Sequence, residues 1–197
     1  MSTGAAVEAV AIGASAGGME ALGVLLQGLP EGFVPAIFAV LHLPPDKPSL
    51  LPELLQRRCR LPVREALDKE GVRPGCVYLA PPDYHLLVEK EKTLALSSDA
   101  PVLFSRPSID VLFESAAEAY GAALLGIVLT GANADGAEGL RAIRQAGGRA
   151  WVQAPNDAVS EAMPAAAIAR AGADLVLPLR DMAERLIHLR TGRPIAL

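Results

Sequence analysis

The sequence contains few of the residues that mark several common classes of protein. Aromatic residues make up 4% of its 197 residues, and there are only two cysteines. Two cysteines cannot build a disulfide framework, and neither belongs to a Cys-x-x-Cys or Cys/His cluster, so no structural zinc site is expected. With so few aromatics, the core has to consist of Ala, Val, Leu and Ile, a composition typical of a buried parallel sheet covered by helices.

The chain also lacks an excess of positive charge and a long apolar run. Its formal net charge is −4, which provides no electrostatic footprint for DNA or RNA. No apolar run is long enough to cross a bilayer, and the first ten residues carry no basic segment of the kind that opens a secretion signal. We therefore expect a cytoplasmic protein that is not membrane-embedded and does not bind nucleic acid.

Apolar runs that end in Gly or Pro alternate with helical patterns, which indicates βαβ units. Strands are predicted over residues 7–13, 35–41, 124–130, 149–153 and 174–178, and helices over 19–27, 49–58, 108–120 and 137–145. Between them, three short strand-like runs at 77–80, 85–89 and 93–96 indicate an antiparallel hairpin region. The prediction is one α/β domain over residues 1–197: a doubly wound, mainly parallel sheet with helices on both faces and a short antiparallel hairpin extension.

The first loop that can carry chemistry is Gly13-Ala14-Ser15-Ala16-Gly17-Gly18, between a predicted strand and helix. It fits the G-x-S-x-G turn that presents a nucleophilic serine. It also fits a degenerate G-x-G-x-x-G phosphate loop, and a plain strand–helix turn built from small residues. The free N–H groups of the helix suit a phosphate or a developing oxyanion equally well.

A histidine follows the second predicted strand. A dinucleotide-binding domain has Asp or Glu at this point to hold the ribose, whereas this chain has His42. If the first two strands are neighbours, His42 lies beside Ser15 and can accept its proton as a general base. A lone histidine is more often structural. The other two are His188, expected on the surface of a terminal helix, and His85, for which the sequence indicates no role.

The third loop follows the apolar strand at 124–130 and runs from Gly131 to Gly136. It contains Asp135 at the start of a predicted helix, where aspartate is a common N-cap. In the functional interpretation its carboxylate orients the imidazole of His42 and stabilises its charged form. The backbone N–H groups of Ala132 and Asn133 in the same loop can then face a reacting carbonyl.

Together, these loops place one Ser, one His and one Asp at the carboxyl ends of three strands, where open α/β sheets bind ligands. The order Ser…His…Asp differs from the Ser…Asp…His order of the α/β-hydrolase fold, so that fold is not implied. Their joint occurrence favours a serine-hydrolase triad over any of the separate interpretations.

An ordered set of motifs resembles the catalytic domain of the CheB-type chemotaxis protein-glutamate methylesterases. The matching segments are 11–18 (AIGASAGG), 42–45 (HLPP), 78–81 (YLAP), 106–113 (RPSIDVLF) and 129–137 (LTGANADGA). The resemblance covers nearly the whole chain. It implies a doubly wound α/β domain with the triad Ser15, His42 and Asp135. The implied substrates are γ-glutamyl methyl esters on the cytoplasmic helices of chemoreceptors or on a related methylated signalling protein. Deamidation of glutamines is implied as a further activity.

The hypothesis needs no metal ion or organic cofactor. Backbone N–H groups near Ala16 and Ala132 are expected to bind the oxyanion, and Arg106 is a candidate for steering an acidic receptor segment. Ser15 lies too near the first residue for the N-terminal receiver domain usual in the family, so we expect either a stand-alone catalytic domain or a trimmed piece of a longer protein. Ala132-Asn133 replaces the family's usual Met-Gly, and Ala16 its usual Thr. The alternatives are a nucleotide-binding module using residues 13–18 and a catalytically silent scaffold of a chemosensory pathway.

Overall fold

A computed structural model describes residues 6–42 and 50–189 of the chain. The strands are β1 (Ala9–Ala14), β2 (Ala36–Leu41), β3 (Val63–Glu65), β4 (Val77–Leu79), β5 (His85–Val88), β6 (Leu94–Ser97), β7 (Leu124–Val128), β8 (Arg149–Gln153) and β9 (Leu175–Leu177). The α-helices are α1 (Gly18–Gln27), α2 (Leu51–Gln56), α3 (Ile109–Tyr120), α4 (Ala137–Gln145), α5 (Ala162–Ala171) and α6 (Leu179–Ile187). Short 3-10 turns follow α3 and β8.

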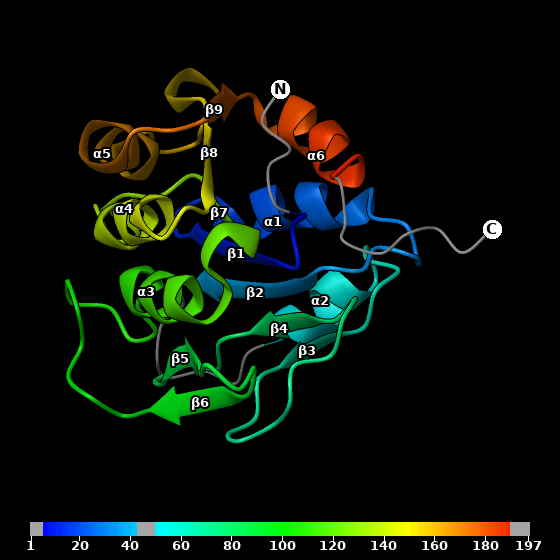
Figure 1. The fold of residues 1–197 in the computed structure, drawn as a ribbon. Helices are drawn as coiled ribbons and strands as arrows, with labels where there is room; N and C mark the ends of the chain where they lie inside the picture. The colour runs from blue at the N-terminus through cyan, green and yellow to red at the C-terminus, as the bar shows by residue number, and fades with distance from the viewer. Residues whose placement is uncertain (1–5, 43–49, 190–197) are drawn as a thin grey trace.

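Seven of the strands form one parallel sheet in the order β3-β4-β2-β1-β7-β8-β9. Helices α1, α2 and α6 cover one face of this sheet, and α3, α4 and α5 cover the other (Figure 1). The predicted doubly wound α/β architecture is therefore confirmed.

The central strands are buried on both faces because each is a continuous run of small and branched apolar residues. All residues of β1, β2 and β7 are buried. Along β1, Val10 and Ile12 point into the core under α1 and α6, whereas Ala9 and Ala11 point into the core under α3 and α4. This alternation follows from the two-residue period of a strand and gives the sheet two separate apolar cores.

The region between residues 62 and 97 divides differently from the prediction. The expected hairpin exists as β5 and β6, which pair antiparallel in a two-stranded sheet of their own. The run at 77–80, which the sequence grouped with the hairpin, instead forms β4 of the parallel sheet, where Val77 pairs with Ile37. An edge strand at Val63–Glu65 was not predicted. Residue 49, the predicted start of a helix, and residues 43–45 of the HLPP motif lie outside the described residues.

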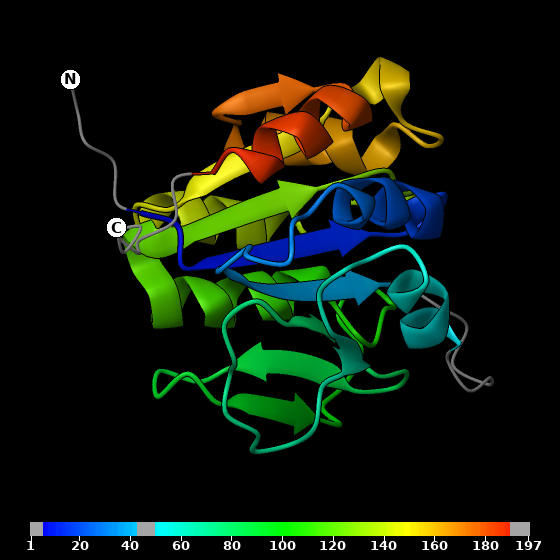
Figure 2. The same ribbon diagram turned by 90° about the vertical axis from the view of Figure 1, so that its right-hand side faces the viewer.

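The parallel register brings three loops to one edge of the sheet. Ala14 at the end of β1 pairs with Leu41 at the end of β2, and Gly13 pairs with Val128 at the end of β7. The chain segments that follow these strands therefore emerge side by side, at the right-hand edge of the sheet in Figure 2. This is the edge at which open parallel sheets bind ligands.

Candidate active site

Ser15 is the first residue after β1, and hydrogen bonds of its own backbone fix it there. Its N–H donates to the carbonyl of Thr130 at 2.9 Å, and its carbonyl accepts from the N–H of Gly18 at 2.8 Å. Gly17, the N-cap of α1, has φ +76°, and a Cβ on it would lie 2.7 Å from Cβ of Val159. Glycine is thus required for a tight turn that leaves Ser15 partly exposed at the sheet edge.

His42 lies opposite Ser15 on the neighbouring strand. Its backbone N–H donates to the carbonyl of Ala14 at 3.2 Å, which continues the β1–β2 ladder by one residue. Its Nε2 lies 2.8 Å from Oδ2 of Asp135, and its side chain is 13% exposed. Because Nε2 is engaged by the carboxylate, Nδ1 is the ring nitrogen that remains for Ser15. No hydrogen bond joins the Ser15 hydroxyl to the ring in this structure, and such contacts often tighten only when substrate binds.

Asp135 is fully buried and accepts hydrogen bonds on both carboxylate oxygens. Besides His42, its donors are the hydroxyl of Ser108 at 2.9 Å and the backbone N–H groups of Ile109 at 2.7 Å and Asp110 at 3.0 Å. The last two are the first N–H groups of α3, so Asp135 also occupies the positive end of that helix. Burial opposes ionisation of Asp135, but the hydrogen bonds from His42, Asp110 and Ile109 outweigh it and hold its pKa below the usual range.

The residues expected to bind an oxyanion have backbone N–H groups that are available. Within the described chain, the N–H groups of Ala16 and Ala132 have no hydrogen-bond partner, and both residues are exposed. The carbonyl of Ala16 accepts from the hydroxyl of Thr130 at 2.8 Å, which holds the first loop to the third. Asn133 accepts the N–H of Asp135 on Oδ1 at 3.2 Å and does not have positive φ, so this position does not require the glycine usual in the family.

Arg106 makes contacts within its own region of the protein. Its guanidinium pairs with the carboxylate of Asp83 at 2.6 Å and donates to the carbonyls of Ser98 and Asp99 at 2.9 and 3.0 Å. These bonds fasten the loop between β6 and α3. The expected role of Arg106 in steering a substrate remains a prediction.

Three polar residues around Asp135 were not identified as functional by sequence reasoning. They are His85, Ser108 and Asp110, which are 2%, 0% and 6% exposed. Burial, together with the smaller effect of the nearby charge of Asp135, raises the pKa of Asp110 to about 6, against the hydrogen bond that its carboxylate accepts from the N–H of Gly139. The only sequence signal was that Ser108 and Asp110 lie in the RPSIDVLF segment.

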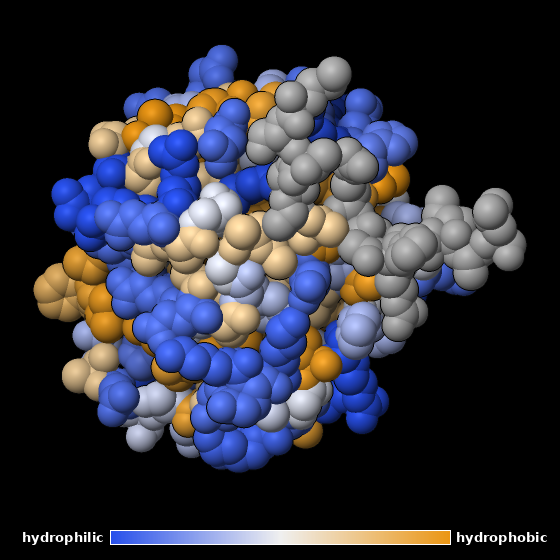
Figure 3. Space-filling view, in the orientation of Figure 1, coloured by the Kyte–Doolittle hydropathy of each residue, from blue (hydrophilic) through white to orange (hydrophobic). Residues whose placement is uncertain are grey.

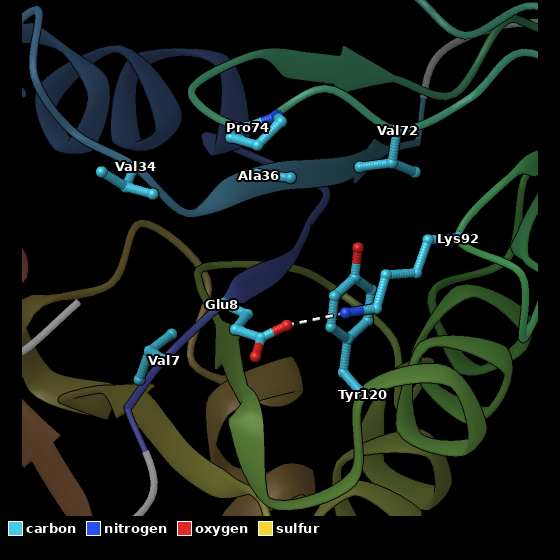
Figure 4. A pocket seen from close by; sticks show the side chains of 8 residues that line it. All are labelled: Val7, Glu8, Val34, Ala36, Val72, Pro74, Lys92 and Tyr120. Carbon is cyan, nitrogen blue, oxygen red and sulfur yellow. Dashed lines mark hydrogen bonds and ion pairs between the residues drawn. The ribbon is translucent and has the colours of Figure 1, made fainter. Parts of the chain in front are cut away.

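A cavity of about 270 Å³ lies at the opposite edge of the sheet, beside the amino ends of β1 and β2. Figure 3 shows this side of the molecule, where hydrophilic residues surround a paler centre. In the cavity Lys92 pairs with Glu8 at 2.7 Å and lies 4.8 Å from the ring centre of Tyr120 (Figure 4). Its charges are paired with each other and its lining contains no Ser, Cys or His, so it lacks the groups for acyl transfer.

The fold and the three loops define an α/β protein with a serine, a histidine and a buried aspartate at the carboxyl edge of a parallel sheet. A family model described as CheB methylesterase matches residues 10–186. The chain belongs to the CheB methylesterase family.

Individual proteins agree with this assignment. The crystal structure of the Thermotoga maritima CheB methylesterase catalytic domain matches with a TM-score of 0.87 and 33% identity, covering 93% of this chain and 98% of that one. A Leptospira interrogans protein, provisionally named protein-glutamate methylesterase/protein-glutamine glutaminase, is 46% identical over 92% of this chain and 94% of its own length. A Methanosarcina acetivorans protein named for the same two activities is 40% identical, and the chain spans 52% of it.

None of the helices in residues 6–42 and 50–189 is long and apolar enough to span a lipid bilayer.

Proposed function

We propose that the protein is a protein-glutamate methylesterase, which hydrolyses γ-glutamyl methyl esters on cytoplasmic helices of chemoreceptors or on a related methylated signalling protein. The observation that carries the proposal is the 2.8 Å bond between His42 and the buried Asp135 beside the loop of Ser15. Membership of the CheB methylesterase family supports the same reaction.

In this mechanism Ser15 is the nucleophile. Its Oγ attacks the ester carbonyl while Nδ1 of His42 accepts the hydroxyl proton, and Asp135 stabilises the imidazolium through Nε2. The tetrahedral intermediate collapses as His42 returns the proton to the departing methoxide, which leaves as methanol. Water then attacks the glutamyl-serine ester by the same proton path and releases glutamate and free Ser15.

The oxyanion of both tetrahedral intermediates would be bound by the N–H groups of Ala16 and Ala132. Each such donor contributes about 3 kcal/mol in related acyl-transfer enzymes. The same acyl-enzyme forms from a glutamine side chain if ammonia leaves instead of methanol, so glutamine deamidation needs no additional residue. Relatives named protein-glutamine glutaminase support this second activity.

The remaining parts of the proposal concern the context of the reaction. A chemoreceptor presents its methylated helices in the cytoplasm, so we place the protein there. We also assign residues 1–197 to one catalytic domain, since the family match runs across both halves of the parallel sheet.

The experiment is a methanol-release assay on a methylated chemoreceptor. The wild-type protein should release methanol, and Ser15→Ala should abolish release without changing the melting temperature. The matched control is Ser98→Ala, because Ser98 is exposed and its side chain makes no hydrogen bond within the described residues. Comparable release by the Ser15→Ala protein would overturn the assignment of the nucleophile.

Labelling with a fluorophosphonate tests the active state independently of the substrate. A reactive Ser15 should be labelled, and His42→Ala should lose the label because the hydroxyl loses its base. A wild-type protein that binds methylated receptor but is never labelled would instead be a silent scaffold.

A further inference from the structure

Ser108 occupies the N-cap position of α3 but does not act as a cap. Its backbone is extended, with φ −107° and ψ 140°, and its hydroxyl accepts no N–H of the helix. A capping serine normally accepts the N–H two or three residues ahead. Here the N–H groups of Ile109 and Asp110 donate to Asp135 instead, so the hydroxyl of Ser108 is available for a contact outside the helix.

That hydroxyl is directed at the catalytic carboxylate. Ser108 Oγ lies 2.9 Å from Oδ1 of Asp135, and Ser108 is 0% exposed, so water does not compete for the contact. An ionised carboxylate can only accept hydrogen bonds, so the hydroxyl must be the donor. Hydrogen bonds to an ionised group are the stronger kind.

The backbone of Ser108 is held in turn by His85 on the hairpin strand β5. Nδ1 of His85 accepts the N–H of Ser108 at 3.1 Å, and its Nε2 lies 3.1 Å from the carbonyl of Ala100. Since Nδ1 accepts, the ring proton must be on Nε2, where it donates to that carbonyl. The imidazole is 2% exposed, so both of its nitrogens are committed to protein groups.

These contacts fix the plane of the carboxylate that the catalytic histidine meets. Oδ1 of Asp135 is taken by the Ser108 hydroxyl and the Asp110 N–H, whereas Oδ2 accepts the Ile109 N–H and faces Nε2 of His42. Turning the carboxylate out of this plane about its Cβ–Cγ bond would strain or break all of these bonds.

We propose that Ser108 and His85 are positioning residues for catalysis: His85 fixes the backbone of Ser108, and the hydroxyl of Ser108 holds Asp135 in the orientation that engages His42. The inference rests on the proposed function for its catalytic meaning, but the bond that it explains can be observed without turnover.

The role predicts an electrostatic effect as well as a geometric one. Without the Ser108 hydroxyl, the negative charge of Asp135 is less well neutralised and holds the proton of the imidazolium more strongly. The acidic limb of the pH–rate profile should therefore move to higher pH, and the rate should fall. The titratable groups that face Asp135 are His42 and, from α3, Asp110; both remain in every variant below.

The first test compares Ser108→Ala, Ser108→Thr and Ser115→Ala. Thr keeps the hydroxyl, and Ser115 is a control from the same helix, because its hydroxyl joins α3 to β5 by accepting the N–H of Val88 at 3.1 Å, whereas that of Ser108 donates to Asp135. The fluorophosphonate labelling rate of Ser15 should fall about tenfold in Ser108→Ala, with the acidic limb shifted upward. Ser108→Thr should restore the position of the limb, and Ser115→Ala should leave it unmoved.

The second test observes the His42–Asp135 bond directly by proton NMR. A low-field Nε2–H resonance of His42 should be present in the wild type and in Ser115→Ala, and lost or shifted in Ser108→Ala. This measurement separates the two proposals. If the wild type is never labelled but its resonance is present and is lost or shifted in Ser108→Ala, the hydrolase function is overturned and the positioning role is supported. An unchanged resonance and limb in folded Ser108→Ala would overturn the positioning role.

The part played by His85 is tested by two amide substitutions. The oxygen of Asn stands near the place of Nδ1 and can still accept the Ser108 N–H, whereas Gln carries its amide nitrogen near the place of Nε2 and retains only the bond to Ala100. In His85→Asn, the acidic limb of the pH–rate profile and the Nε2–H resonance of His42 should therefore lie closer to their wild-type positions than in His85→Gln. The reverse order would show that His85 merely supports the loop at Ala100.

Discussion

Replacement of Asp135 by Asn gives the sharpest prediction, because it keeps the size of the side chain and removes acceptor capacity. The carboxylate accepts from four donors, two on each oxygen. An amide can present an oxygen on one side only. If its NH₂ group replaces Oδ1, it faces the N–H of Asp110, and if it replaces Oδ2, it faces the N–H of Ile109.

Either orientation leaves a buried backbone donor without an acceptor, which costs about 1–3 kcal/mol, and weakens the remaining bonds because they lose the charge. One effect opposes this loss: Asp110 no longer has a charged neighbour. It is the smaller effect, because burial rather than Asp135 is the main cause of the raised pKa of Asp110. We expect a net loss of about 3 kcal/mol, or about 6–12 °C in Tm.

The assay is urea and thermal unfolding of Asp135→Asn beside Asp99→Asn, whose exposed carboxylate has no hydrogen-bond partner within the described residues. Ester hydrolysis should fall about 10⁴-fold, as with the equivalent change in other triads. Equal stability of the two variants would refute the description of Asp135 as the shared acceptor of α3 and His42.

Three further predictions concern neighbouring sites. The pKa of Asp110 is about 6 in the folded protein against an ordinary 3.8, so its contribution to stability is full below pH 3.8 and is lost as the pH rises through about 6. Asp110→Asn should flatten that fall and raise the free energy of unfolding at pH 7 by up to about 3 kcal/mol. Urea titrations of the variant that show the wild-type pH dependence would contradict this prediction. Gly17→Ala should lower stability by about 1–2 kcal/mol and methanol release more than tenfold, because φ is +76° and the new Cβ would lie 2.7 Å from Cβ of Val159. Val159→Gly, which removes that Cβ, should recover only the steric part in melting and turnover measurements. Phe104→Gly should raise the free energy of unfolding by about 0.5 kcal/mol, since Phe104 has φ +62° and is fully exposed; a lower Tm would reveal a contact for this side chain.

The prediction of the fold depended on local patterns, and these worked where burial was uniform. The apolar runs of β1, β2, β7 and β8 and the amphipathic pattern of α4 need no distant information, and the boundaries of α4 and β8 agree with the predicted ranges. The region of residues 62–97 was harder because its strands have only three or four residues. In runs so short, pairing with a parallel or an antiparallel neighbour is decided by contacts elsewhere, such as that of Val77 with Ile37.

The sequence by itself determined where the chemistry gathers. Three apolar strands, each followed by one of Ser15, His42 and Asp135, imply that these residues meet at one edge, because the ends of neighbouring parallel strands emerge together. Only the tertiary structure decided how the aspartate is held. Ser108 is 27 residues and His85 is 50 residues from Asp135 along the chain, counting from their residue numbers, and no local pattern relates them. They come together because α3 packs beside α4 and directs its first N–H groups at a buried carboxylate, a hydrogen-bonding requirement that exists only once water has been excluded.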